Sequence, residues 1–133
     1  PIKSSAASDV YKRQGYIRKM RRKDIGISTY ADYDVAFHME LAVASQNRLL
    51  IAVYTAIEPL MKQIVEHVVK SGGKVENDSG FHAAILERIK ARDPEGAQDK
   101  MKDHLTASER MFQDSIEPDT GLDQVLLWTS QPV

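Results

Sequence analysis

The sequence contains no cysteine among its 133 residues. This absence excludes disulfide scaffolds, cysteine-ligated zinc sites and thiol nucleophiles, so a transition-metal site would have to use histidine and carboxylate ligands. No segment approaches the roughly 18 consecutive apolar residues that predict a membrane span, and we expect no membrane partner. An excess of charge is also lacking, because 18 Lys and Arg residues face 19 Asp and Glu residues. This balance argues against binding nucleic acid through overall charge.

The composition is otherwise that of an ordinary globular domain, with 42% apolar and 28% charged residues, and the length suits one hydrophobic core. Residues 1–14 differ from the rest, because they are mostly small and polar and show no helical or strand period. Their stretch SSAASDVYKRQ resembles a translated sequencing adapter. We therefore expect residues 1–14 to be foreign to the protein and without regular structure, and the natural chain to begin further upstream.

From Gly15 onward, apolar residues recur three or four positions apart, which is the period of amphipathic helices, and no useful length alternates as a strand would. The clearest helices are predicted over residues 29–46 and 48–70, over a segment that carries Phe81, Ile85, Leu86 and Ile89, and from Pro94 to about residue 116. Pro59 predicts a kink in the second of these helices, and Asn47 and Asp93 are predicted helix caps. The fold class is therefore all-α, an antiparallel helical bundle. Residues 119–133 form a tail for which no structure is predicted.

An apolar stripe runs along the predicted helix over residues 48–70, which indicates a face that packs on other helices. It consists of Leu50, Val53, Ile57, Leu60, Ile64 and Val68. The next helix is predicted to begin after a cap at Asn77 or Asp78, once Ser71-Gly72-Gly73 has closed the preceding one.

Asp34 and His38 are four residues apart in the segment predicted to be helical over residues 29–46. This spacing places both side chains on one face of a helix, one turn apart, where both can point at a common centre. Two metal ligands fit this arrangement, and so does a surface ion pair or a satisfied buried pair. The spacing alone leaves these readings open.

His82 and His104 carry a sharper signal, because the residue midway between them is Asp93, at the predicted Asp93-Pro94 turn. In an antiparallel hairpin each histidine would lie about eleven residues from the turn, and at a rise of about 1.5 Å per residue both would stand at the same height. Each shares a helix face with apolar residues, which are Ile85, Leu86 and Ile89 for His82, and Ala97 and Met101 for His104. Both imidazoles are therefore predicted to point inward.

Two interpretations of these inward histidines stay open on spacing alone. Each can be a neutral core histidine that is bonded to a carbonyl or a carboxylate. Alternatively, they share one metal ion that Asp34 and His38 complete from a crossing helix. Three nitrogen ligands and one oxygen ligand suit a divalent ion such as Zn, Ni, Mn or Fe.

Five short motifs, read in order, carry a family resemblance. They are Asp34-Val-Ala-Phe-His38, Ala44-Ser-Gln-Asn47, His82-Ala-Ala-Ile-Leu86, Asp93-Pro-Glu-Gly-Ala97 and Met101-Lys-Asp-His104-Leu105. Together with the 22-residue step from His82 to His104, they resemble the effector-binding FCD domain of GntR-type transcription regulators of the FadR subgroup. The resemblance runs from about Tyr16 to Ile116, and it places an FCD-like domain at residues 15–118.

The resemblance implies that Asp34, His38, His82 and His104 bind a divalent metal ion inside the bundle, and that the metal holds the carboxylate of a small organic-acid effector. It also implies a cytoplasmic homodimer that binds DNA only through an N-terminal winged-helix domain. That domain and most of the first helix of the effector domain have no counterpart in this sequence, so we expect a truncated chain. Tyr33, Asn47 and Arg48 are candidate effector contacts, because they are near the metal ligands in the sequence.

Two other functions are compatible with the same residues. A small metalloenzyme could use the Asp/His site, with Glu40 or Glu87 as a general base, although no known catalytic motif is present. A helical dimerisation module with purely structural histidines is the third possibility. The family resemblance favours the sensing domain, which is not an enzyme.

Overall fold

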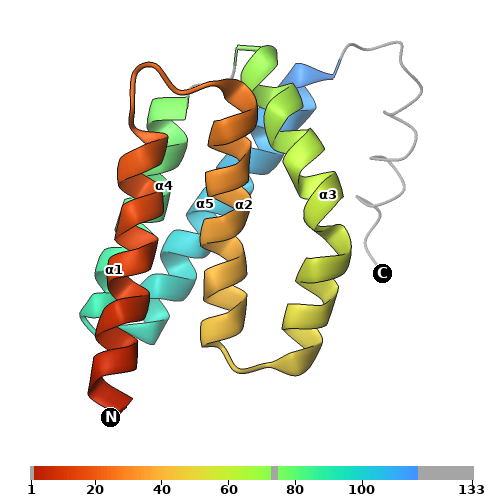
Figure 1. Cartoon of the computed structure of the whole chain (residues 1–133). Helices are drawn as coiled ribbons and strands as arrows, with labels where there is room; N and C mark the ends of the chain where they lie inside the picture. The colour runs from red at the N-terminus through yellow and green to blue at the C-terminus, as the bar shows by residue number, and fades with distance from the viewer. Residues whose placement is uncertain (1, 73–74, 117–133) are drawn as a thin grey trace.

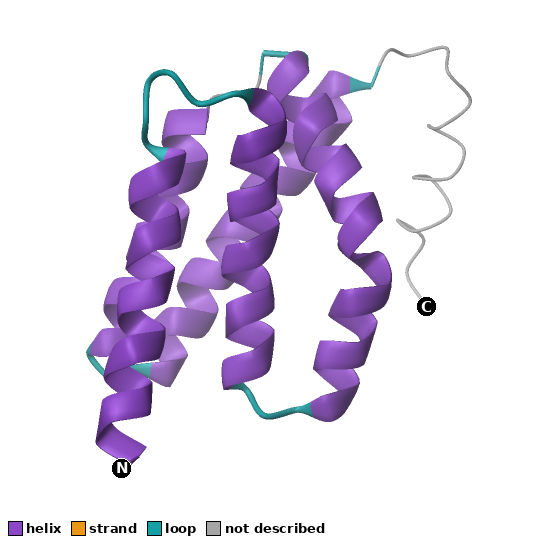
Figure 2. Ribbon diagram, viewed as in Figure 1, coloured by secondary structure: helices purple, strands orange, loops and turns teal. Residues whose placement is uncertain are grey.

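The computed structural model describes residues 2–72 and 75–116, and all the regular structure in these ranges is helical (Figures 1 and 2). This part of the chain confirms the predicted all-α class. None of its helices is both long and apolar enough to cross a lipid bilayer. The helices are α1 (Ile2–Met20), α2 (Ile27–Ala44), α3 (Arg48–Lys70), α4 (Val75–Lys90) and α5 (Pro94–Ser115).

The helices are arranged so that each packs against two others. Helix α2 contacts α1 and α3, α4 contacts α1 and α5, and α5 returns to contact α3. Successive helices run in opposite directions, as Figure 1 shows for the hairpin of α2 and α3. Inside the bundle, the inner faces of α2, α4 and α5 meet at three histidines, which are His38, His82 and His104.

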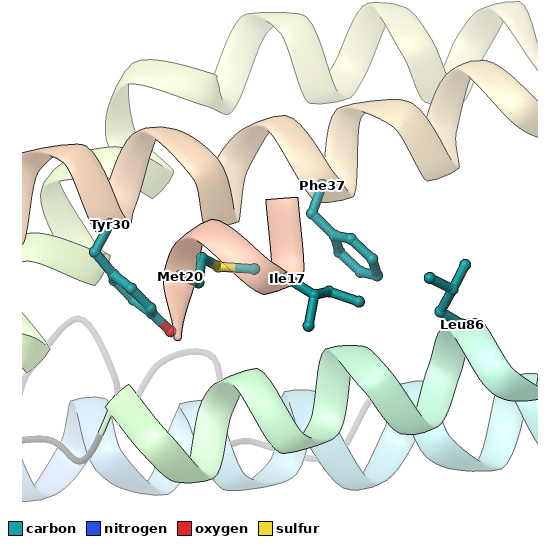
Figure 3. Packing of buried hydrophobic residues seen from close by; sticks show 5 residues of the cluster. All are labelled: Ile17, Met20, Tyr30, Phe37 and Leu86. Atoms are coloured by element: carbon teal, nitrogen blue, oxygen red, sulfur yellow. The ribbon is translucent and has the colours of Figure 1, made fainter. Parts of the chain in front are cut away.

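The hydrophobic core lies between α1, α2 and α4. Its buried members are Ile17, Met20, Tyr30, Phe37 and Leu86. In Figure 3, Tyr30 and Phe37 extend from α2 toward α4, and Leu86 extends in the opposite direction. Tyr30 and Phe37 are seven residues apart, which is two helical turns, so a single face of α2 provides both. This packing fixes the rotation of α2 about its axis, and with it the direction of the site residues on α2.

The helix ends follow the sequence signals that were predicted for them. The side chain of Asn47 accepts hydrogen bonds from the backbone N–H groups of Leu49 and Leu50, at 3.0 and 3.2 Å. The side chain of Asp93 accepts one from Gly96 N–H at 2.9 Å, and Pro94 begins α5. These caps satisfy N–H groups that have no partner within the helix. Helix α4 already begins at Val75, so the predicted caps Asn77 and Asp78 lie within it, which corrects that prediction.

Residues 1–14 were expected to have no regular structure, and this expectation is wrong for the described residues. Helix α1 begins at Ile2 and includes all of them. Val10 packs against the core cluster, and Arg13 is buried with an exposed fraction of 4%. The first part of α1 has no clear apolar period, yet it is helical and packs against the other helices. Packing of this kind stabilises helices whose own sequence signal is weak. The adapter origin of this segment stays a prediction.

The apolar stripe of α3 does not pack as its sequence indicates. Leu50, Val53, Ile57 and Leu60 are 38–55% exposed, and α3 has no buried residue. Helix α3 has its main contacts with α2 and α5, and the exposure of these four residues shows that most of the stripe faces away from the bundle. The helix continues through Pro59 from Arg48 to Lys70, and Figure 1 shows its axis bending along the way.

Truncating Leu86 tests the core. Leu86 is 1% exposed, so Leu86→Ala should lower the free energy of unfolding by about 2–5 kcal/mol through lost burial and a cavity. Leu49 is 73% exposed, so Leu49→Ala should change the free energy of unfolding by about 0.5 kcal/mol or less. Denaturant unfolding measures both variants. Equal losses in the two variants would contradict the described core.

Candidate metal centre

Three histidines from three helices converge inside the bundle. The Nε2 atom of His38 on α2 lies 3.1 Å from Nε2 of His82 on α4 and 3.1 Å from Nε2 of His104 on α5. The ring of His38 stacks on that of His104 with an interplanar angle of 9°, and it meets His82 at 71°. The three rings therefore present the same nitrogen toward one small volume.

The heights of His82 and His104 agree with the hairpin argument. Their ring centroids are 4.6 Å apart, although 22 residues separate them in the sequence. Asp93 and Pro94 make the turn between α4 and α5, and the two helices pack along each other. Exposed fractions of 0% for His82 and 4% for His104 show that both side chains point inward, as predicted.

Asp34 lies one turn before His38 on α2 and is also buried, with an exposed fraction of 4%. Its Oδ1 atom is 3.1 Å from Nε2 of His82. Burying a carboxylate is costly unless it is paired, and the imidazole provides that partner. The structure brings the three histidines together as one group, whose ligand atoms all lie within 4.8 Å of one another. Asp34 adjoins this group through His82 but is not a member of it, so its role as a fourth ligand stays a prediction.

The donor set fits a divalent transition metal. Two nitrogens that bind one ion at about 2.0–2.1 Å lie about 2.8–3.4 Å apart when the angle at the ion is about 90–110°. The measured separations of 3.1 Å fall in this range. Hydrogen bonding explains them less well, because Nε2 of a neutral imidazole offers either one proton or one lone pair, and Nε2 of His38 faces two other nitrogens.

Aromatic and apolar side chains enclose the histidines on the core side. The ring of Phe37 lies 4.7 Å from that of His82 and 5.5 Å from that of His38, centroid to centroid. Phe81 lies 5.8 Å from His104. Because these rings exclude water, interactions between charges at the centre are stronger than they would be at the surface.

A cavity of about 130 Å³ adjoins the histidines between α2, α3 and α5. His38, His104 and Asp34 line one part of it. The other residues that line it are Tyr30, Tyr54, Met61, Ile64, Val65, Val68, Val69, Leu105, Ser108 and Met111. His38 and His104 therefore face a space that can accept a small molecule.

Sequence reasoning missed Tyr54, which lines this cavity from α3. Its ring lies 6.3 Å from that of His38, and its buried hydroxyl has no hydrogen-bond partner among the described residues. Burial raises the pKa of this phenol far above its usual value, and the negative charges of Asp34 and Glu58 raise it further. Tyr54 is therefore a hydrogen-bond donor at neutral pH. Tyr54 lies seven residues before Met61 and fourteen before Val68, so the sequence already indicated that the three share one face of a helix.

The three candidate effector contacts lie away from this cavity. Tyr33 faces α1, where its ring is 6.1 Å from that of Tyr16 and Lys19 Nζ lies 5.0 Å from its centroid. Asn47 is occupied in capping α3, and Arg48 is exposed in the first turn of that helix. None of them lines the cavity, so the structure gives their predicted role in effector binding no support.

The fourth histidine, His67, was left outside the predicted site and lies outside the cluster. Its Nε2 atom is 3.2 Å from the backbone oxygen of Ser115, and its side chain is exposed. The basic residues between Arg18 and Lys23 are exposed as well, as expected for a solvated surface.

Comparison with known families identifies the domain. The FCD domain family matches residues 3–107, and the chain belongs to this family. FCD domains are the effector-binding domains of GntR-family transcription regulators, which fits a ligand-sensing role and a helical fold. Neither the curated proteins nor the solved structures include a significant match to the chain.

Metal analysis of two histidine variants tests the centre. Purified protein loaded with Zn²⁺ should retain about one ion per chain, and His104→Ala should lose it because one of three imidazoles is removed. His67→Ala is the matched control and should retain the ion. Elemental analysis measures the zinc content per chain. Zinc that is absent from the wild type, or retained by His104→Ala, would contradict the centre and favour structural histidines.

Proposed function

We propose that this chain is a metal-dependent sensing domain for a small organic acid. Asp34, His38, His82 and His104 hold one divalent ion, and the carboxylate of the acid binds beside it in the adjoining cavity. The observation that supports this most directly is the convergence of three Nε2 atoms from three helices, with two separations of 3.1 Å. Membership of the FCD family supports the sensing role.

The chain's own residues have separate tasks in this proposal. The three imidazoles and Asp34 place the ion at the end of the cavity, and the packing of Phe37 and Leu86 in the core holds α2 and α4 in register. A divalent cation bound there supplies positive charge and exchangeable positions for carboxylate oxygens. Tyr54 lines the same cavity and donates a hydrogen bond to the acid from the side of α3.

Binding at this position can change how the helices are arranged. The ligands come from α2, α4 and α5, while α3 contributes much of the cavity wall. An acid that contacts both parts favours the arrangement in which those contacts are best, and it shifts the balance only by the difference in its affinity for the two arrangements. We propose that a homodimer of such domains, of the FadR subgroup, transmits this change to a DNA-binding domain outside the present sequence.

The geometry favours sensing over hydrolysis by a metalloenzyme. Glu40 was one candidate general base, and it forms an ion pair with Lys12 between α2 and α1. Glu87 was the other, and its 69% exposed side chain pairs with Lys90 at 2.6 Å. Neither glutamate lines the cavity beside the histidines. A general base must come within hydrogen-bond reach of the proton that it removes.

Acetate binding tests whether the centre recognises a carboxylate. Isothermal titration calorimetry should detect acetate binding to the Zn²⁺-loaded wild type and none to the chelator-treated protein. His67→Ala, loaded in the same way, should bind acetate as the wild type does. Equal binding with and without metal would contradict a metal-dependent site, and absence of binding to the loaded protein would contradict recognition of carboxylates.

A tyrosine variant tests the hydrogen bond from α3. Tyr54→Phe removes only the hydroxyl, so acetate affinity should fall by about tenfold or more, as expected for a hydrogen bond to a charged group. The zinc content should not change. Tyr11 is 68% exposed on α1, so Tyr11→Phe is the matched control and should bind normally. Normal acetate affinity in Tyr54→Phe would show that the hydroxyl does not contact the acid.

A further inference from the structure

The cavity has one polar end and one apolar end. The polar end is formed by Asp34, His38 and His104, and the Tyr54 hydroxyl lies on the α3 side. Ser108 adds little polarity, because its hydroxyl donates a hydrogen bond to the backbone oxygen of His104 at 2.9 Å. The apolar end consists of Met61, Ile64, Val65, Val68, Val69, Leu105 and Met111.

Positively charged side chains are absent from the described part of the cavity lining. Among the described residues that line the cavity, none is a lysine or an arginine. Lys62 follows the lining residue Met61, but it pairs with Asp32 at 2.5 Å on the outer surface of α2 and α3. The apolar end is partly open, since Leu105 is 54% exposed and α3 has no buried residue. A second carboxylate placed against these apolar side chains would still lose part of its hydration and gain no charged partner, which is unfavourable.

The size of the cavity limits the ligand as well. Its volume is about 130 Å³. Engineered apolar cavities of roughly 150 Å³ accommodate a benzene molecule. Because the carboxylate at the histidine end shares the volume, the space suits a hydrocarbon body of about four to six carbons. A carboxylate at the histidine end would direct such a body along α3 toward Val68 and Met111.

We propose that this domain selects monocarboxylic acids with a hydrocarbon body of about four to six carbons, and that it rejects dicarboxylic and tricarboxylic acids of similar size. This inference rests on the proposed function and adds the ligand class. The polar end binds the single carboxylate, and the apolar side chains of α3 and α5 contact the rest of the molecule. The free energy of binding then depends on the hydrocarbon body as well as on the metal.

Three acids that differ in one feature each test the proposal. Acetate has the carboxylate without the body, hexanoate has both, and adipate has the same number of carbons as hexanoate with a second carboxylate. Each is titrated calorimetrically into the Zn²⁺-loaded wild type, and zinc is quantified in the same samples. Each buried methylene contributes about a fourfold gain, so hexanoate should bind at least about tenfold more tightly than acetate. Adipate should bind at least about tenfold more weakly than hexanoate.

A cavity-filling variant localises the effect. Val68 lines the cavity and is outside the core cluster, so Val68→Phe should occupy the space and reduce hexanoate affinity to that of acetate. Zinc content should not change, because Val68 is not a member of the histidine group. Val53 lies on the same helix, 48% exposed, and Val53→Phe is the matched control that should bind hexanoate normally. If Val68→Phe does not fold, the comparison of the three acids on the wild type still tests the proposed ligand class.

The outcomes separate this proposal from the one on which it rests. Zinc and acetate binding in which hexanoate is not the tightest of the three ligands would overturn the proposed ligand class and leave the metal-dependent sensing site intact. Failure of the loaded protein to bind any of the acids would overturn both. Normal hexanoate affinity in folded Val68→Phe would show that the hydrocarbon body lies elsewhere, which also overturns the proposal.

Discussion

The candidate metal centre depends on three imidazole nitrogens that meet inside a helical bundle. His38, His82 and His104 reach one another only if α2, α4 and α5 have the correct height and rotation, since Nε2 of His38 lies 3.1 Å from both partners. The Asp93 cap and Pro94 set the α4–α5 hairpin, and Phe37 fixes α2 through the core. Ordinary features such as a helix cap and a buried phenylalanine therefore determine the geometry of the centre.

Two relations within the candidate centre could be predicted because they obey local rules. The four-residue step from Asp34 to His38 and the equal distances of His82 and His104 from the turn are consequences of helix geometry alone. Only part of the cavity wall could be predicted in this way, because Ile64 and Val68 of the α3 stripe line it. Leu50, Val53 and Ile57 form a regular stripe on α3, yet they are exposed, whereas Tyr54 lines the cavity. Which side of an apolar helix faces the bundle depends on its neighbours, and the periodicity of one helix does not specify them.

Helix α1 shows the opposite case. Its sequence has a weak apolar period, and its first half resembles foreign sequence, but Ile17 and Met20 belong to the core cluster. Arg13 is buried on the same helix, which no amphipathic pattern would indicate. Helices in proteins derive most of their stability from packing rather than from intrinsic propensity. Sequence patterns therefore underestimate a helix whose contacts come mainly from α2 and α4.

The three histidines and most of the apolar cavity wall lie on different helices. The three histidines come from α2, α4 and α5, and each of these helices has at least one buried residue. Helix α3 contributes cavity wall but has no buried residue. A metal ion alone would contact only the former group. An acid with a hydrocarbon body would contact both, and couplings of about 1–3 kcal/mol are typical when a ligand distinguishes two arrangements. The apolar contacts with α3 would therefore make the domain's response depend on the effector as well as on the metal.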